Sequence, residues 1–274
     1  MRIDGKKIRD EIKEELRKEL LSSLNSPTIA IISVGNNPVI QQFVNIKKRF
    51  AHEIGVEVIV SELPHESTID MVNNIVEKYN ADPAVKGIIV QLPLPRHIDT
   101  SSVLNCIAQS KDVDVLVESS LARFKNNDLP ILPPVIGAVS ELCERFNIQI
   151  KNKNILVVGS GRLVGAPGAT WFRQQGGNVT VVDNPSEDIL TCASQADIIL
   201  SGAGSAGLLK KEMLKQGVVL FDAGTSESEG VVLGDADPSC EEVSEIFTPV
   251  PGGIGPITIA MIFKNLTILN KKNS

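Results

Sequence analysis

A glycine-rich segment in the second half of the chain has the residue types that bind a phosphate group. It reads Gly-Ser-Gly-Arg-Leu-Val-Gly over residues 159–165 and follows the apolar run 154–158. In such a loop the first glycine permits a tight turn, the second lets backbone amides approach a pyrophosphate, and the third allows close helix packing. The following helix adds unpaired N–H donors at its amino end. The candidate cofactor-binding residues of this loop are Gly159, Ser160, Gly161, Arg162, Val164 and Gly165.

A carboxylate at the end of the next apolar run supports a dinucleotide as the ligand. Asp183 follows residues 179–182 and lies 24 positions after Gly159, near the spacing of a carboxylate that binds the ribose hydroxyls. The loop alone is a weak signal, because it has one extra residue before its last glycine and tight glycine turns also occur without a ligand. A buried strand before the loop, a helix after it and Asp183 together favour dinucleotide binding.

The first half of the chain holds three further candidates. Phe43 and Lys47 are four positions apart and share one helix face. Gln91 ends the apolar run 86–91, and ligands of open parallel sheets bind beyond such strand ends. In the segment 111–114 (Lys-Asp-Val-Asp), extended backbone would point both aspartates the same way, with the lysine able to cap one of them. Taken singly, each fits a solvated face or a turn; together they predict a chemical cleft beside the dinucleotide domain.

The elements that position these residues alternate between strand-like and helical patterns. Continuous apolar runs are typical of strands buried on both faces, and their alternation with helices indicates parallel sheets with helical crossovers. Strands are predicted at 28–34, 56–60, 86–91, 154–158, 179–182, 197–200 and 217–221. Helices are predicted at 6–22, 39–54, 68–79, 136–147 and 257–269.

The predicted fold class is α/β with two α/β domains. A proline-rich segment at 130–134 separates the two series of elements, and we place the first, catalytic domain at 1–125. Residues 126–274 would form a Rossmann-type dinucleotide-binding domain, with the C-terminal helix packing back on the first domain.

Composition excludes several classes of function. A net charge of −6 and 4% aromatic residues argue against a nucleic-acid partner. No apolar run approaches the roughly 20 residues that span a bilayer, and the charged N-terminus is unlike a signal peptide. We therefore expect a cytoplasmic protein without a membrane partner. The scattered cysteines and histidines have no ligand spacing, so we expect no metal site; they are Cys106, Cys143, Cys192, Cys240, His52, His65 and His97.

Five ordered motifs resemble one enzyme family over nearly the whole chain. The motifs are Val-Gly-Asn-Asn-Pro at 34–38 followed by Phe43 and Lys47, Gly-Ile-Ile-Val-Gln-Leu-Pro-Leu-Pro at 87–95, Lys-Asp-Val-Asp at 111–114, Val-Gly-Ala-Pro at 164–167, and Thr-Pro-Val-Pro-Gly-Gly-Ile-Gly-Pro-Ile-Thr at 248–258. The last is the most specific. The chain is similar in these motifs to the methylenetetrahydrofolate dehydrogenase/cyclohydrolase family.

The resemblance implies a bifunctional enzyme of one-carbon metabolism. It would oxidise methylenetetrahydrofolate with NAD or NADP and hydrolyse the methenyl product to formyltetrahydrofolate. Lys47 would catalyse the hydrolysis, Gln91 would orient that lysine and the substrate, and Asp114 would accept hydrogen bonds from the pterin. Phe43, where the family usually carries tyrosine, would stack on the folate. The loop residues that would help close the cleft over the substrate and nicotinamide are Pro251, Gly252, Gly253 and Pro256.

The cofactor positions depart from the family pattern. The family commonly uses NADP, but Ser160 and Asn184 occupy positions where it carries an arginine and a serine. Asp183 adds a carboxylate that favours the ribose hydroxyls of NAD. Arg162 is a cation that could serve NADP instead, so both cofactors stay open, with a preference for NAD. Val115 also departs, because it replaces a glycine beside Asp114 and adds bulk there.

Other functions remain open at this level. The same two-domain build serves dehydrogenases that act on other small substrates, although Lys47, Gln91 and Asp114 argue against that. A dehydrogenase-only member, or a non-catalytic member that binds folate or nucleotide, is the further alternative, because Phe43 lacks the tyrosine hydroxyl. The family resemblance also implies a homodimer.

Overall fold

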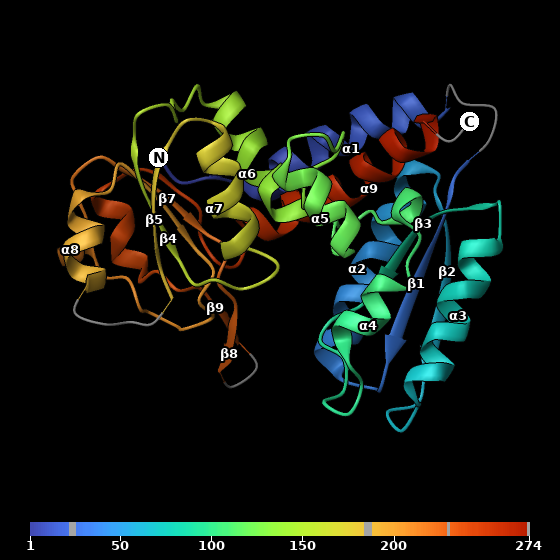
Figure 1. Cartoon of the computed structure of the whole chain (residues 1–274). Coiled ribbons are helices and arrows are strands. Elements are labelled where there is room, and N and C mark those ends of the chain that lie inside the picture. The colour runs from blue at the N-terminus through green and yellow to red at the C-terminus, as the bar shows by residue number, and fades with distance from the viewer. Residues whose placement is uncertain (22–25, 184–187, 229–230, 273–274) are drawn as a thin grey trace. The chain divides into compact units, whose positions relative to one another are not determined.

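The computed structural model describes residues 1–21, 26–183, 188–228 and 231–272 (Figure 1). Its Cα positions divide into two compact units. Asp10–Pro134 and Ile259–Ser274 form the three-stranded unit, and Met1–Arg9 with Val135–Thr258 form the five-stranded unit. The predicted boundary at 125/126 lies at the end of helix α5, before the division at Pro134.

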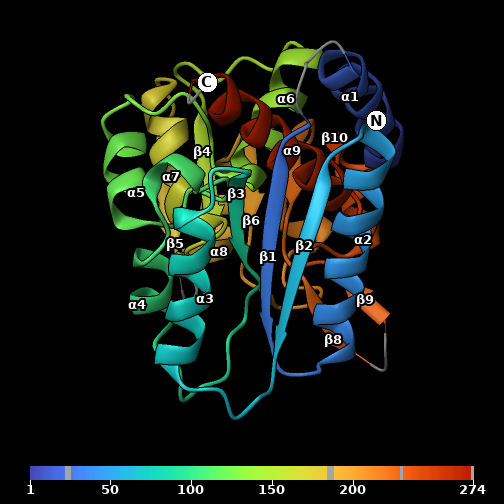
Figure 2. The same cartoon turned by 90° about the vertical axis from the view of Figure 1, so that its right-hand side faces the viewer.

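The three-stranded unit is a parallel α/β layer built on one fully buried strand. Its strands are β1 (Thr28–Val34), β2 (Glu57–Leu63) and β3 (Val85–Val90), in the order β2-β1-β3. Every residue of β1 is buried, as its continuous apolar run predicted. Ile31 pairs with Val60 on one side and Ile89 on the other. Helices run alongside these strands in Figure 2.

The crossover helices of this unit begin and end at recognisable caps. Helix α2 (Pro38–Ile54) starts after Asn37, whose side chain accepts the N–H of Val39 at 2.9 Å. It ends at Gly55, whose φ of 80° is left-handed, as expected for this glycine. The other helices of the unit are α3 (Ile69–Ala81), α4 (Thr100–Asn105), η1 (Gln109–Lys111) and α5 (Glu118–Lys125).

Two long helices cross the division of the chain into units. Helix α1 (Gly5–Leu21) starts in the five-stranded unit and continues into the three-stranded one. Helix α9 (Ile254–Lys272) does the same from residue 259 onward. In the three-stranded unit Phe263 of α9 stacks on Phe50 of α2 with ring centroids 5.1 Å apart. The C-terminal helix therefore packs on the first domain, as predicted.

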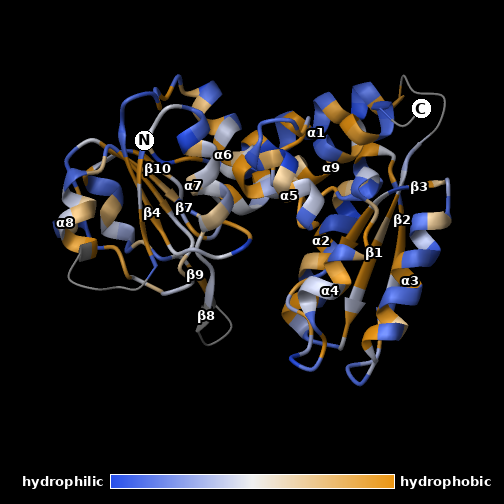
Figure 3. Ribbon diagram, in the orientation of Figure 1, coloured by the Kyte–Doolittle hydropathy of each residue, from blue (hydrophilic) through white to orange (hydrophobic). Residues whose placement is uncertain are grey.

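The five-stranded unit is a parallel sheet in the order β10-β7-β6-β4-β5. Its central strands β4, β6 and β7 are mostly apolar, and Figure 3 shows much of the sheet in the hydrophobic colour. The sheet strands are β4 (Asn154–Val158), β5 (Asn178–Val182), β6 (Ile198–Ser201), β7 (Val218–Asp222) and β10 (Ser244–Phe247). The remaining elements are α6 (Pro134–Arg145), α7 (Gly165–Gln174), α8 (Asp188–Gln195), η2 (Lys211–Met213), η3 (Pro238–Glu242) and the antiparallel pair β8 (Ser226–Ser228) and β9 (Val231–Leu233).

The sequence predicted seven of these sheet strands and missed β10. The seven agree with the structure to within a few residues. Five of them are mostly buried, whereas β2 and β5 are largely accessible to solvent. Strand β10 has four residues, of which the first two are polar, so no apolar run marks it. Short elements such as α4 and α5 were also missed. The predicted helix 6–22 is confirmed to Leu21, and its last residue, Ser22, lies outside the described residues.

Candidate active site

Lys47 and Gln91 meet in the three-stranded unit although 44 positions separate them. The Lys47 Nζ donates a hydrogen bond of 2.6 Å to the Gln91 Oε1. The Gln91 Nε2 donates to the carbonyl of Leu92 at 2.9 Å, which fixes which end of the amide faces the lysine. The backbone N–H of Gln91 donates to Ile32 of β1, so this side chain projects from the carboxyl edge of the sheet. The structure thus brings two predicted site residues together.

The surroundings of Lys47 disfavour its charged form. Burial among protein atoms lowers the pKa of the Lys47 ammonium, and the negative charge of Asp114 opposes that shift. Burial also raises the pKa of the Asp114 carboxyl to about 6; the charge of Lys47 opposes this and the charge of Asp112 adds to it. Both side chains remain partly accessible. A lysine whose pKa is lowered gives up its proton more readily than an ordinary lysine, which suits it to proton transfer.

Phe43 lies one helical turn before Lys47 and is unusually exposed. Its side chain is 42% exposed, whereas its neighbour Val44 is buried. The spacing within α2 places Phe43 on the same helix face as Lys47. An exposed aromatic ring one helical turn from a lysine offers a flat apolar surface to a ring-shaped ligand.

Lys111, the first residue of the segment 111–114, forms hydrogen bonds outside that segment. The Lys111 Nζ donates to three backbone carbonyls at the end of α3, those of Tyr79, Asn80 and Asp82, at 2.7–2.8 Å. Lys111 therefore caps the C-terminal end of α3. These hydrogen bonds go to backbone carbonyls and not to Asp112 or Asp114, which we had expected Lys111 to cap.

The two aspartates of this segment have separate surroundings. Asp112 is 1% exposed, and its carboxylate accepts the backbone N–H groups of Leu116 and Val117 at 3.1 and 3.0 Å. Burial raises the pKa of the Asp112 carboxyl, and these hydrogen bonds oppose the shift. Asp112 therefore holds the backbone that follows, whereas Asp114 faces the lysine charge.

Val115 adopts a backbone conformation that favours glycine. Its φ is 56°, in the left-handed region, and its side chain is fully buried. A left-handed conformation costs an L-residue roughly 1–2 kcal/mol, and β-branched side chains tolerate it poorly. The Asp112 carboxylate accepts hydrogen bonds from the N–H groups of Leu116 and Val117, and these bonds maintain the turn at Val115 despite that cost.

The glycine-rich loop of the five-stranded unit has the geometry of a phosphate cradle. Gly159 has a φ of 90°, and a Cβ there would lie 2.9 Å from the Gly202 carbonyl oxygen. A Cβ at Gly165 would lie 1.9 Å from the carbonyl oxygen of Gly159, so α7 starts in close contact with the turn. At Gly161 a Cβ would meet open space, which leaves the backbone accessible to a ligand. These positions fit the roles predicted for the three glycines.

Asp183 lies at the carboxyl end of β5 and contacts this loop directly. Its Oδ1 accepts the backbone N–H of Ser160 at 2.8 Å, and its side chain is exposed. The carboxylate is therefore held beside the loop, where a ribose would be expected. The predicted position Asn184 lies outside the described residues.

A second loop beside the glycine-rich one escaped the sequence prediction. It follows β6 at 202–205, and its Gly202 donates a backbone hydrogen bond of 2.9 Å to Val158 of β4. The buried carboxylate of Asp235 orders it by accepting the N–H groups of Ala203 and Ser205 at 2.8 and 2.7 Å. The sequence signal was present as a buried-strand end followed by Gly-Ala-Gly-Ser, but it resembled an ordinary linker.

A backbone hydrogen bond and close packing hold the loop that follows β10. Gly252 has a φ of 108°, and the Gly253 N–H donates to the Pro249 carbonyl at 2.7 Å. A Cβ at Gly5 would lie 1.8 Å from the Gly253 carbonyl oxygen, so the N-terminal residues pack tightly on this loop. Pro256 lies in the first turn of α9, where proline is tolerated because its missing N–H has no partner within the helix.

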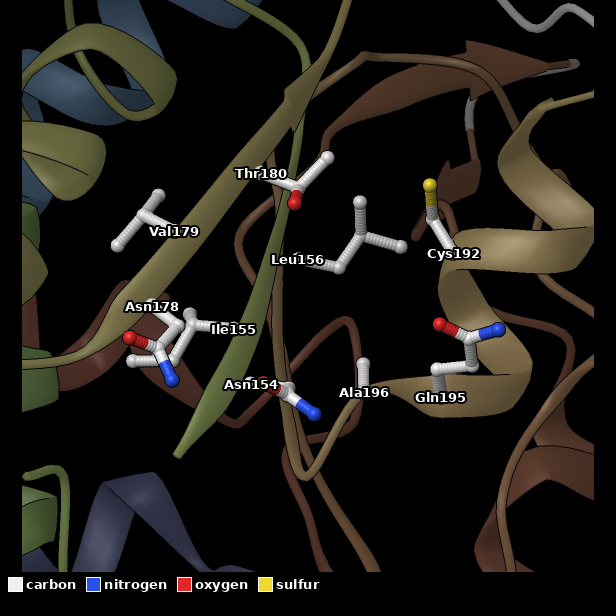
Figure 4. A pocket seen from close by; sticks show the side chains of 9 residues that line it. All are labelled: Asn154, Ile155, Leu156, Asn178, Val179, Thr180, Cys192, Gln195 and Ala196. Carbon is white, nitrogen blue, oxygen red and sulfur yellow. The ribbon is translucent and has the colours of Figure 1, made fainter. Parts of the chain in front are cut away.

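The pocket drawn in Figure 4 lies elsewhere on the five-stranded unit. Its lining includes Asn154 and Asn178, which begin β4 and β5, and Cys192 of α8. Because ligands of parallel sheets bind at the carboxyl ends of the strands, this pocket is not the expected dinucleotide site.

Among the residues that the structure describes, no three His, Cys, Asp or Glu side chains gather in a way that could hold a metal ion. Within the same residues, no helix is long and apolar enough to cross a membrane.

Comparison with known proteins matches both halves of the chain to one family. The family model described as "Tetrahydrofolate dehydrogenase/cyclohydrolase, catalytic domain" matches residues 3–114. The family model described as "Tetrahydrofolate dehydrogenase/cyclohydrolase, NAD(P)-binding domain" matches residues 133–274. The bifunctional protein FolD of Acetivibrio thermocellus is 37% identical over 268 residues, which cover 96% of this chain and 94% of that protein.

Solved structures agree with this over the full length. The bifunctional enzyme FolD, a methylenetetrahydrofolate dehydrogenase/cyclohydrolase from Campylobacter jejuni, has a TM-score of 0.95 and 34% identity, and the match covers 100% of this chain and 99% of that one. The Trypanosoma brucei enzyme complexed with NADP cofactor and inhibitor has a TM-score of 0.94 and 31% identity, covering 99% and 97%.

Proposed function

The chain belongs to the tetrahydrofolate dehydrogenase/cyclohydrolase family, and from that premise we propose that Lys47, Gln91 and Asp114 form its folate-reacting centre. The enzyme oxidises methylenetetrahydrofolate with NAD or NADP to methenyltetrahydrofolate and hydrolyses that product to formyltetrahydrofolate. The hydrogen bond of 2.6 Å between Lys47 and Gln91, coupled to the charge of Asp114, is the observation that carries the site assignment.

Substrate binding in this proposal depends on two side chains. The Asp114 carboxylate accepts hydrogen bonds from neighbouring N–H groups of the pterin, a pairing of two donors with one carboxylate. Phe43 supplies an exposed apolar face for the aromatic middle of the folate. Together they fix the one-carbon bridge relative to Lys47.

The residues of the glycine-rich loop fit a dinucleotide, because Gly161 leaves its backbone open and α7 begins directly behind Gly165. We assign Gly159, Ser160, Gly161, Arg162, Val164, Gly165 and Asp183 to that site. A bound nicotinamide would supply the acceptor for a hydride from the one-carbon bridge. No protein base is needed for that transfer, since no proton leaves with the hydride.

Hydrolysis of the methenyl cation requires a proton acceptor. A water oxygen bonds to the cationic carbon while neutral Lys47 Nζ takes a proton from that water. One carbon–nitrogen bond then breaks as Lys47 returns that proton to the departing nitrogen. The remaining hydroxyl proton is released to solvent as the carbon–oxygen double bond forms, which leaves a formyl group on the other nitrogen. Gln91 keeps the amine pointed at the substrate, because its Oε1 accepts from the Nζ.

A direct assay tests the proposed function. Purified protein is mixed with methylenetetrahydrofolate and either NAD or NADP. We expect reduced nicotinamide to accumulate, with methenyltetrahydrofolate absorbance rising only transiently because hydrolysis removes it. Absence of reduced nicotinamide with both cofactors would refute the dehydrogenase assignment, and a stable methenyl signal would refute the hydrolase step.

The cofactor choice gives a separate prediction. We expect higher catalytic efficiency with NAD, because the Asp183 carboxylate beside Ser160 repels the extra phosphate of NADP. Asp183→Ser should shift the preference toward NADP by about tenfold, the effect of roughly 1.4 kcal/mol. Kinetics with both cofactors measure this. A native preference for NADP that Asp183→Ser leaves unchanged would instead assign the phosphate to a cation such as Arg162.

Three finer points belong to the same proposal. Pro251, Gly252, Gly253 and Pro256 contact the substrate, as their motif implies.

The enzyme acts as a homodimer, which sedimentation of the purified protein would test. It acts in the cytoplasm, an assignment supported by four free cysteine thiols.

A further inference from the structure

Asn265 is a buried polar residue in an otherwise apolar stretch of α9. Its side chain is 5% exposed, among neighbours such as Phe263 and Leu266 that are 1% exposed. The Asn265 Nδ2 donates two hydrogen bonds of 2.8 Å, one to the carbonyl of Val113 and one to that of Leu132. All of these residues belong to the three-stranded unit. Both donor protons of the amide are thereby used, as expected for a buried amide.

The carbonyl of Val113 belongs to the peptide that leads directly into Asp114. A hydrogen bond to this oxygen restrains rotation of that peptide and hence the direction in which the next side chain leaves the backbone. The Val113 side chain is also confined, because a Cβ at Gly87 would lie 2.7 Å from its Cγ1.

The backbone after Asp114 is restrained as well. Asp112 accepts the N–H groups of Leu116 and Val117, and Val115 is held in its left-handed conformation. Hydrogen bonds thus restrain the backbone on both sides of Asp114: the Asn265 amide holds the carbonyl before it, and the Asp112 carboxylate holds the N–H groups after it. Asn265 lies on a helix 152 positions away from Val113 in sequence.

We propose that Asn265 is a positioning residue for the folate reactions, which sets the direction of the Asp114 carboxylate by holding the carbonyl of Val113. The proposal rests on the proposed function, in which Asp114 binds the pterin. Loss of a residue that only packs would lower the free energy of unfolding but leave the folate affinity of the folded enzyme unchanged. Loss of Asn265 should also lower the folate affinity.

The test compares Asn265→Ala with a matched control on the same helix. Thr267 is also 5% exposed, but its hydroxyl donates only within α9, to the carbonyls of Phe263 and Lys264 in the hydrogen bonds described. We expect Asn265→Ala to raise the KM for methylenetetrahydrofolate about tenfold, the effect of roughly 1.4 kcal/mol. The KM for the dinucleotide should stay unchanged. Thr267→Val should lower stability without changing either KM.

Two further variants keep the result decisive. If Asn265→Ala does not fold, Asn265→Leu replaces it, because leucine fills a similar volume but has no N–H to donate to the two carbonyls. Asp114→Ala is measured in parallel. A folate KM that responds to Asp114→Ala but not to the Asn265 variants would overturn this inference alone. A folate KM that responds to neither would overturn the assignment of Asp114 in the proposed function.

Discussion

Lys47→Met is expected to reduce methenyltetrahydrofolate hydrolysis by about 10²–10⁴-fold, the usual contribution of a positioned general acid or base. Methionine preserves the length and apolar contacts of the side chain but cannot accept a proton. The hydride transfer needs no such group, so dehydrogenase activity should fall much less. Separate assays of the two steps, one following methenyl decay and the other nicotinamide reduction, measure the split.

A neighbouring lysine provides the control for this variant. Lys48 is on the same helix but exposed to solvent, so Lys48→Met should leave both activities intact. The native hydrolysis should rise with pH through the pKa of Lys47, since only the neutral amine accepts a proton, and burial places that pKa below the ordinary lysine value. Hydrolysis that survives in Lys47→Met would exclude this lysine as the catalyst.

Asp114→Ala is expected to weaken folate binding by on the order of 2–4 kcal/mol, because two pterin donors would be left buried and unpaired. That corresponds to a rise in folate KM of roughly 30- to 1,000-fold in both reactions. Asp70, an exposed aspartate on α3 of the same unit, is the control, and Asp70→Ala should change neither KM. An unchanged folate KM in Asp114→Ala would remove this residue from the pterin site.

The same carboxylate predicts a pH dependence of substrate affinity. Burial raises the pKa of Asp114 to about 6, so the side chain is mostly ionised at pH 7 and becomes protonated as the pH falls below 6. Protonation removes part of its capacity to accept hydrogen bonds. The folate KM of the native enzyme should therefore rise as pH falls through 6. Asp114→Asn, which has no titrating group, should lose that dependence.

The sequence alone determined most of the local architecture. Strand β1 was predictable because seven consecutive residues are buried in a parallel sheet, which requires a continuous apolar run. Gly55 and Gly159 were predictable because both stand where a helix or strand must turn, and both have positive φ. The motif at 111–114 could be recognised from its residues, but the sequence did not show that Asp112 binds backbone N–H groups while Asp114 faces the charge of Lys47.

Only the tertiary structure decided which side chains meet. Lys47 and Gln91 are 44 positions apart, and Val113 and Asn265 are 152 positions apart, so no periodicity within one helix or strand relates them. Lys111 could be expected to pair with an adjacent aspartate until packing placed the end of α3 against it. Side-chain periodicity records the burial and backbone conformation of one element at a time, whereas these contacts depend on how several elements pack together in three dimensions.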